Sequence, residues 1–158
     1  SLMHDHGVNV VAQAKEVGIQ SIPKLPFVYV YERLDLAIKL YGATIYPEPI
    51  KEALQDDSLE RYVTGKFTMM TKYDLKQDQY LEINIELQPM MEMNLALEQR
   101  ILTIIIDSLI KKNAEYKNNY GSIPRAVTPR LIFWSHQDPF YFRMGIKQKW
   151  VREVAVAQ

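Results

Sequence analysis

His4, Asp5 and His6 are the first residues in the sequence whose types suggest chemistry, because histidine and aspartate are common metal ligands. A structural metal site needs about four ligands, and His136 is the one further histidine. The sequence has no cysteine, which excludes disulfides, thiolate ligands and a cysteine nucleophile. We therefore expect no metal site in this chain.

Several other residues each allow a structural and a functional interpretation. Arg33 and Asp35 lie two apart in a predicted turn, where an ion pair or a turn cap would explain them. Asp35 also lies in a connector, the kind of place where a hinge residue absorbs a large backbone change. Gly42 suits either a strand bend or a close backbone approach. Lys147 and Lys149 by themselves fit a solvated basic tract.

The composition is that of an ordinary globular chain of 158 residues, with 47% hydrophobic and 24% charged residues. The 19 basic and 19 acidic residues give a formal net charge of zero, so no overall field favours nucleic acid or an anionic membrane. We find no signal-peptide pattern and no apolar run of membrane-spanning length. We expect a cytoplasmic protein that binds neither nucleic acid nor membrane.

Local patterns predict the elements that must position these residues. Residues 4–22 favour a turn and a short helix, and the prolines in 22–26 mark a linker. Strands are predicted at 27–31, 37–45, 62–73, 81–87 and 129–134, and helices after Pro47 and over about 93–116. In the strand at 81–87, apolar residues alternate with Glu82, Asn84 and Glu86. That alternation predicts one buried face and one face in water.

The order of elements between about residues 37 and 135 is β-α-β-β-α-β. This order predicts an α+β, ferredoxin-like domain, in which two helices cover one face of an antiparallel sheet. A short helical extension precedes it. We place the boundary in the proline-rich linker, so that residues 1–24 form a separate segment and residues 25–158 form the main domain.

Two stretches of the sequence are similar to a known family. Residues 32–50 contain Arg-x-Asp, a following lysine, Tyr-Gly and Ile-x-Pro, and this string resembles the hinge region of adenylate-forming acyl- and aryl-coenzyme A ligases. Residues 138–151 are similar to the end of the phenylacetate-coenzyme A ligase-like subgroup, where a glycine loop precedes an essential lysine. The resemblance extends over about residues 25–151.

The resemblance implies a C-terminal lid domain of an ATP-dependent ligase that joins phenylacetate, or another aryl or acyl acid, to coenzyme A. Residues 1–24 would be the tail of the large adenylation domain or a linker. The whole enzyme would use ATP and Mg²⁺ to make an acyl-adenylate and would then form a thioester with coenzyme A. Its partners would be the N-terminal adenylation domain and a small carboxylate, and a homodimer is left open. The chain alone is expected to be inactive.

The same resemblance assigns a role to individual residues. Asp35 would be the hinge, Arg33 and Asp5 would bind the nucleotide, and Tyr41 with Gly42 would belong to the loop that serves coenzyme A. Lys147, with Lys149 as the alternative, would be the catalytic lysine. A mobile cation there would stabilise the charge that develops on the transferring phosphoryl group.

Two other functions stay open at this point. The chain could be a stand-alone ferredoxin-like ligand-binding or regulatory module that dimerises through its sheet edge. It could also belong to an adenylyl transferase of the same superfamily that does not use coenzyme A. Ferredoxin-like folds host many functions, so the fold alone does not decide between them.

Overall fold

The computed structural model describes residue 16, residues 36–144 and residues 150–151. The strands and helices described below belong to the second of the two units into which the chain divides, Arg33–Gln158. The predicted boundary between residues 1–24 and 25–158 and the strand at 27–31 lie outside the described residues. So does the N-terminal helix, apart from Glu16, and these expectations stay predictions.

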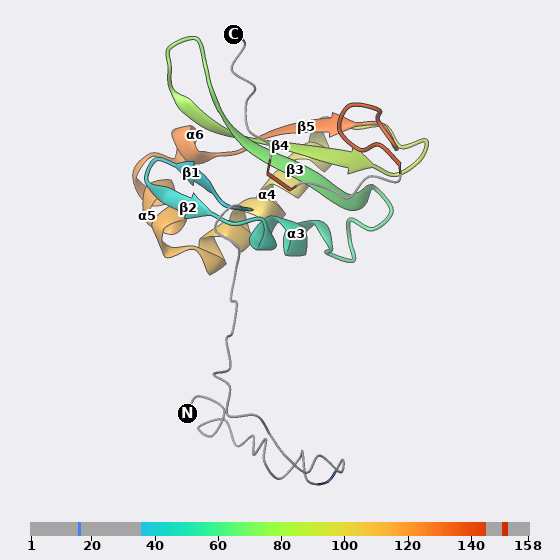
Figure 1. The fold of residues 1–158 in the computed structure, drawn as a ribbon, viewed down its shortest axis with the longest axis horizontal. Helices are drawn as coiled ribbons and strands as arrows, with labels where there is room; N and C mark the ends of the chain where they lie inside the picture. Colours follow the sequence, from blue (N-terminus) through green and yellow to red (C-terminus); the bar gives the residue numbers. More distant parts are fainter. Residues whose placement is uncertain (1–15, 17–35, 145–149, 152–158) are drawn as a thin grey trace. The chain divides into compact units, whose positions relative to one another are not determined.

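A three-stranded sheet forms the upper layer of the described fold in Figure 1. β3 (Val63–Tyr73) and β4 (Gln79–Leu87) are antiparallel, and β5 (Arg130–Trp134) lies on the other side of β4. The α+β class that the sequence predicts is confirmed, and the arrangement is consistent with a small ferredoxin-like domain. The strands predicted at 62–73, 81–87 and 129–134 agree closely with β3, β4 and β5.

One strand pairing differs from the expected antiparallel sheet, because β5 runs parallel to β4. The chain between them forms α4 (Leu95–Lys112), α5 (Ala114–Ser122) and α6 (Pro124–Val127). Such a helical connection returns the chain to the start of the sheet, so the next strand has the direction of the previous one. In the expected arrangement a strand from residues 37–45 would separate β4 from β5, but those residues pair with each other instead.

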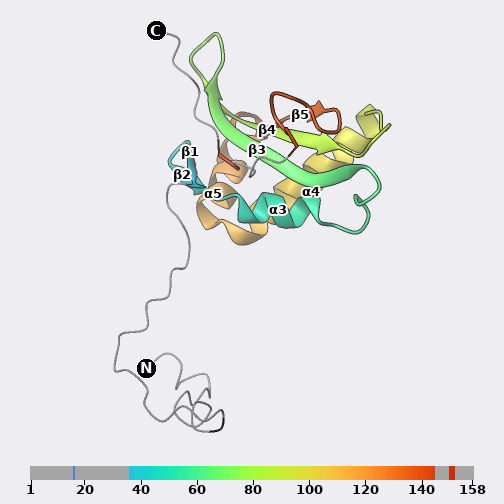
Figure 2. The same cartoon turned by 45° about the vertical axis from the view of Figure 1, so that its right-hand side comes forward.

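Two helices cover one face of the sheet, as predicted. α3 (Glu48–Leu54) and α4 lie side by side beneath the three strands, as Figure 2 shows. Pro49 lies in the first turn of α3, where a missing N–H costs nothing. The core between the layers consists of fully buried apolar side chains from strands and helices, among them Phe67, Ile83, Ile85, Ile101 and Ile105.

The single strand expected at residues 37–45 is wrong, because the structure has a hairpin there. β1 (Ile38–Leu40) and β2 (Ala43–Ile45) pair with each other, and Tyr41 and Gly42 form the two-residue turn. Both turn residues have positive φ angles, 47° and 84°. Positive φ at both central positions matches the right-handed twist of the flanking strands. The buried apolar positions shift from Ile38 and Leu40 to Ala43 and Ile45 across the turn, a change of phase that the prediction of one continuous strand ignored.

The helix expected over residues 93–116 is also wrong in its extent, because Asn113 divides it into α4 and α5. Asn113 has an extended backbone with φ −132° and ψ 104°. Its Oδ1 accepts a hydrogen bond from the Tyr116 backbone N–H at 2.9 Å, which caps α5, and its Nδ2 donates to the Thr44 carbonyl at 2.8 Å. The chain therefore turns where an asparagine cap is tied to the β1–β2 hairpin.

Replacement of Asn113 by alanine is expected to lower the free energy of unfolding by about 1–2 kcal/mol. The variant loses a helix cap and a hydrogen bond to another element at the same time. Urea unfolding followed by circular dichroism measures the loss. Asn118→Ala, at an exposed position of the same helix, should cost less than about 0.5 kcal/mol. Equal losses in the two variants would contradict the capping role.

Candidate functional site

Five of the predicted site residues lie outside the described residues, namely Asp5, Arg33, Asp35, Lys147 and Lys149. His4 and His6 also lie outside them. Tyr41 and Gly42 are described, and they lie together at the tip of the β1–β2 hairpin. The part of the candidate site that the structure describes is therefore the surroundings of this turn.

The Tyr41–Gly42 turn is held from two directions. The Tyr41 N–H donates to Gln79 Oε1 at 2.9 Å, and the Tyr41 carbonyl accepts from Asn119 Nδ2 at 3.0 Å. These bonds offset the cost of a non-glycine residue at positive φ, which is roughly 1 kcal/mol. No heavy atom apart from the chain neighbours lies within 4 Å of the position that a Cβ would take on Gly42. The turn is thus a fixed backbone that presents a bare glycine to open space.

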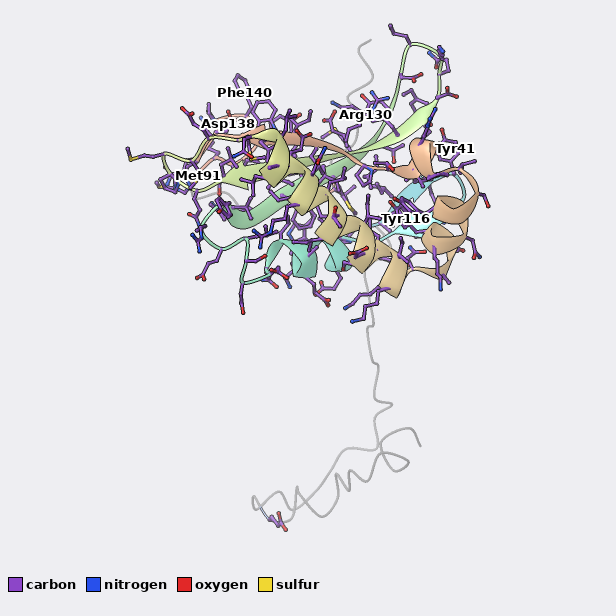
Figure 3. The ribbon with its side chains drawn as sticks, turned by 180° about the vertical axis from the view of Figure 1, so that it is seen from behind. Tyr41, Met91, Tyr116, Arg130, Asp138 and Phe140 are labelled. Atoms are coloured by element: carbon purple, nitrogen blue, oxygen red, sulfur yellow. The ribbon has the colours of Figure 1, made fainter. Side chains whose placement is uncertain are left out.

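A pocket of about 330 Å³ lies beside this turn. Its walls come from the tip of the β3–β4 hairpin, from α6 and from the start of β5, and they include Tyr41, Asp74, Asp78, Tyr80, Arg125 and Arg130. Figure 3 places Tyr41 and Arg130 toward the same end of the molecule, away from Met91, Asp138 and Phe140. The pocket therefore combines two guanidinium groups with two carboxylates and two phenol rings.

The second face of β4, predicted to be exposed to water, is buried. Glu82 is 7% exposed, and Asn84 and Glu86 are 0% exposed. The segment of residues 135–142 packs over Glu86, and Figure 2 shows it on the side of the sheet opposite to α3 and α4. The expectation failed because the alternating pattern identifies polar positions but does not tell whether another segment packs over them.

Glu86 binds that covering segment. Its carboxylate accepts hydrogen bonds from Thr64 Oγ1 at 2.6 Å and from the Gln137 backbone N–H at 2.7 Å, and Lys66 Nζ lies at 3.0 Å. His136 Nδ1 lies 3.8 Å from the same carboxylate. Burial alone would raise the pKa of Glu86, but the bonds from Thr64, Gln137 and Lys66 outweigh it and hold the pKa below its ordinary value.

A second set of bonds continues along the same face. Glu82 Oε1 is 2.7 Å from Lys72 Nζ and accepts from Asn84 Nδ2 at 3.1 Å, while Trp134 Nε1 donates to Asn84 Oδ1 at 2.7 Å. Burial lowers the pKa of Lys72, but the bond and the charge of Glu82 raise it more, so the net shift is upward. Thr68 is buried on this face, and its hydroxyl has no hydrogen-bond partner among the described residues.

Aromatic packing completes the attachment of the segment. The rings of Trp134 and Tyr141 stack with centroids 4.3 Å apart, and Phe142 is 4% exposed. Beyond it, the Met69 N–H donates to the Trp150 carbonyl at 2.6 Å at the edge of β3. The described residues on both sides of 145–149 are thus bound to the sheet. The aromatic residues that follow β5 could have indicated, from the sequence alone, that this segment packs against a face of the sheet.

Two further kinds of site receive no support from the described part of the chain. None of its histidine, aspartate or glutamate side chains form a group of three that could hold a metal ion. None of its helices is long and apolar enough to cross a membrane.

Comparison with known proteins finds similarity among solved structures but not among sequences. No protein-family model matches the sequence, and no curated protein matches it significantly. Among solved structures, a domain of phenylacetate-coenzyme A ligase from Bacteroides vulgatus ATCC 8482 is similar, with 15% sequence identity and a TM-score of 0.47. The match covers 75% of this chain and 92% of that chain.

Proposed function

We propose that this chain is the lid domain of an adenylate-forming ligase that activates a carboxylate with ATP and transfers the acyl group to coenzyme A. The observation that carries the proposal is the hinge-like string of residues 32–50, whose described part contains a fixed turn with an open glycine at φ 84°. A glycine without neighbours at the tip of a rigid hairpin suits close approach of backbone to a substrate.

In this proposal the two halves of the reaction use different surfaces of the lid. The Tyr41–Gly42 turn would approach the pantetheine arm of coenzyme A in the thioester-forming state, where a side chain on residue 42 would obstruct it. Asp35 would be the pivot, Arg33 and Asp5 would contact the nucleotide, and Lys147 or Lys149 would serve adenylate formation. Closure of the lid would exclude water from a reactive mixed anhydride. The large adenylation domain would supply the remaining contacts to ATP, Mg²⁺ and the acid.

Two glycines of this chain allow a matched test of the turn. Gly42 and Gly65 have similar φ angles, 84° and 80°, and neither has a neighbour within 4 Å of an added Cβ. Gly42→Ala and Gly65→Ala should therefore destabilise the fold equally, by about 1 kcal/mol. In the full-length protein, only Gly42→Ala should slow thioester formation, by at least about tenfold, because it displaces the reacting groups. Adenylate formation should change little in either variant.

The measurements are carboxylate-dependent exchange of pyrophosphate into ATP and formation of the coenzyme A thioester by the full-length protein. Thermal unfolding checks that the two variants have the same stability. Thioester formation that is equal in the Gly42→Ala and Gly65→Ala variants would remove the turn from the second half-reaction. Loss of both half-reactions in Gly42→Ala alone would also contradict the assigned role.

A further inference from the structure

We propose that the pocket between the β3–β4 hairpin, α6 and β5 binds the phosphorylated part of a nucleotide, with Arg125 and Arg130 as its anion-binding groups. The pocket has the volume of a small-ligand site, about 330 Å³. The proposal rests on two arginine residues that have no role in the ligase proposal, and it shares only Tyr41 with it. Its test needs only this chain, so it does not depend on the proposed function.

Arg130 is pre-organised for an anion. Its guanidinium carbon lies 3.8 Å from the centroid of the Tyr80 ring, so the guanidinium lies over the ring face. A stacked guanidinium keeps its five donors in one plane, the geometry that matches two oxygens of a phosphate. The stack also reduces the rotamer freedom that the side chain would lose on binding.

The nearest strand partner does not neutralise Arg130. The register pairs Arg130 with Glu82, but the Glu82 carboxylate is bound to Lys72 at 2.7 Å and to Asn84 at 3.1 Å. Among the described residues, Arg130 forms no ion pair with a carboxylate, and neither does Arg125. Both guanidinium groups line the same pocket, and neither has a counter-ion within the part of the chain that the structure describes.

The backbone that carries Arg125 is fixed by the core. The neighbouring Val127 is fully buried, and its carbonyl accepts a hydrogen bond from the buried Tyr116 hydroxyl at 3.1 Å. The Thr128 hydroxyl donates to the Pro124 carbonyl at 2.8 Å, which closes the short α6 helix. Arg125 therefore belongs to a segment with a fixed backbone, and it lines the same pocket as Arg130.

The acidic residues that line the pocket, Asp74 and Asp78, limit the class of ligand that it can bind. Asp74 Oδ1 already accepts from the backbone N–H groups of Lys76 and Asp78, so it forms the hairpin turn. The exposed Asp78 carboxylate has no such bond in the described part of the chain and can accept from sugar hydroxyls or a base amino group. Tyr41 adds an aromatic surface for a base. Two arginines with one available carboxylate suit a nucleotide better than a nucleic-acid strand, which needs an extended basic stripe.

The test is direct binding to this chain, measured by calorimetry with ADP, coenzyme A, inorganic phosphate and pantetheine as probes. We expect ADP and coenzyme A to bind at submillimolar to millimolar concentrations, inorganic phosphate to compete with them, and pantetheine not to bind.

Arg130→Ala should weaken binding at least about tenfold, since a charge-assisted bidentate contact is lost. Arg130→Lys should also weaken binding, because lysine keeps the positive charge but lacks the planar guanidinium group that can bond two phosphate oxygens at once. Equal affinity for the two nucleotides would point to the shared diphosphate, and tighter coenzyme A binding would point to its additional phosphate.

Arg61 provides the matched control, because its guanidinium also lies over a tyrosine ring, that of Tyr62 at 5.7 Å, outside this pocket. Arg61→Ala should leave nucleotide affinity unchanged, and circular dichroism should give the same unfolding temperature for all binding-site variants within a few degrees. No ADP or coenzyme A binding at millimolar concentrations would overturn the proposal. So would an equal loss of affinity in Arg61→Ala, or binding of pantetheine alone. None of these results would bear on pyrophosphate release by the full-length ligase, so the two proposals fail separately.

Discussion

Replacing Glu86 with alanine is expected to lower the free energy of unfolding by about 3 kcal/mol. Its side chain is completely buried, and its loss leaves the Thr64 hydroxyl and the Gln137 N–H without their acceptor. Lys66 is 46% exposed and can return to water, so we expect the lower end of the range for a broken buried pair. Urea unfolding of the purified chain measures the change.

Two variants separate the charge of Glu86 from its position. Glu86→Gln keeps the volume and part of the hydrogen bonding and should cost less than the alanine variant. Glu92→Ala, at an exposed position, should stay within about 0.5 kcal/mol of the wild type. A loss below about 1 kcal/mol in Glu86→Ala would mean that the covering segment does not depend on this carboxylate.

The same carboxylate predicts how stability depends on pH. Its pKa in the folded chain is held below the ordinary value of 4.5, so its stabilising contribution is fully present above about that pH. The contribution is lost as the pH falls through the lowered value. Glu86→Gln has no such group, so its stability should fall less steeply below pH 4.5 than that of the wild type. Parallel acid-unfolding curves would contradict the assignment.

Lys147→Ala in the full-length protein is expected to reduce carboxylate-dependent pyrophosphate release by at least about a hundredfold. The expectation rests on the proposed function, in which this lysine stabilises charge on the transferring phosphoryl group. Lys149→Ala should have a much smaller effect, and Lys111→Ala, at an exposed position of α4, should have none. The measurement is the initial rate of release with the best carboxylate of a panel.

The pair of lysine variants also decides between the two candidates. A large loss in Lys149→Ala with normal activity in Lys147→Ala would move the catalytic role to Lys149. Normal release in both variants would remove the role from this tract altogether. Thioester formation from a preformed acyl-adenylate should survive in Lys147→Ala, because the lysine would serve only the first half-reaction.

Periodicity predicted those elements whose stability comes from one buried stripe. The strand around Leu81, Ile83 and Ile85 and the helix around Ile101 and Ile105 bury the residues that their spacing indicated. The breaks between elements depend on contacts between residues far apart in the sequence. Asn113 ends a helix by binding Thr44, and the Tyr41 turn is held by Gln79 and Asn119. The local sequence pattern does not predict these hydrogen bonds, because their partners lie far away in the sequence.

The candidate site was only partly accessible to sequence reasoning for the same reason. Tyr41 and Gly42 were found through the string of residues 32–50, and the structure places them at one exposed turn. The arginine pocket beside them was missed, because α6 and β5 bring Arg125 and Arg130 next to a hairpin that lies about 50 residues earlier. Glu86 was predicted to be exposed to water, because the segment that covers it comes much later in the chain and the local pattern does not reveal it.

The most direct test of the central proposal is ATP-dependent pyrophosphate release by the full-length protein across a panel of aryl and acyl carboxylates. The proposal predicts release that requires one of these acids, followed by thioester formation when coenzyme A is added, and no release by the 158-residue chain alone. Absence of carboxylate-dependent release from the full-length protein on a broad panel would contradict it and favour a ligand-binding module. Release without thioester formation would instead indicate an adenylating enzyme that uses another acceptor.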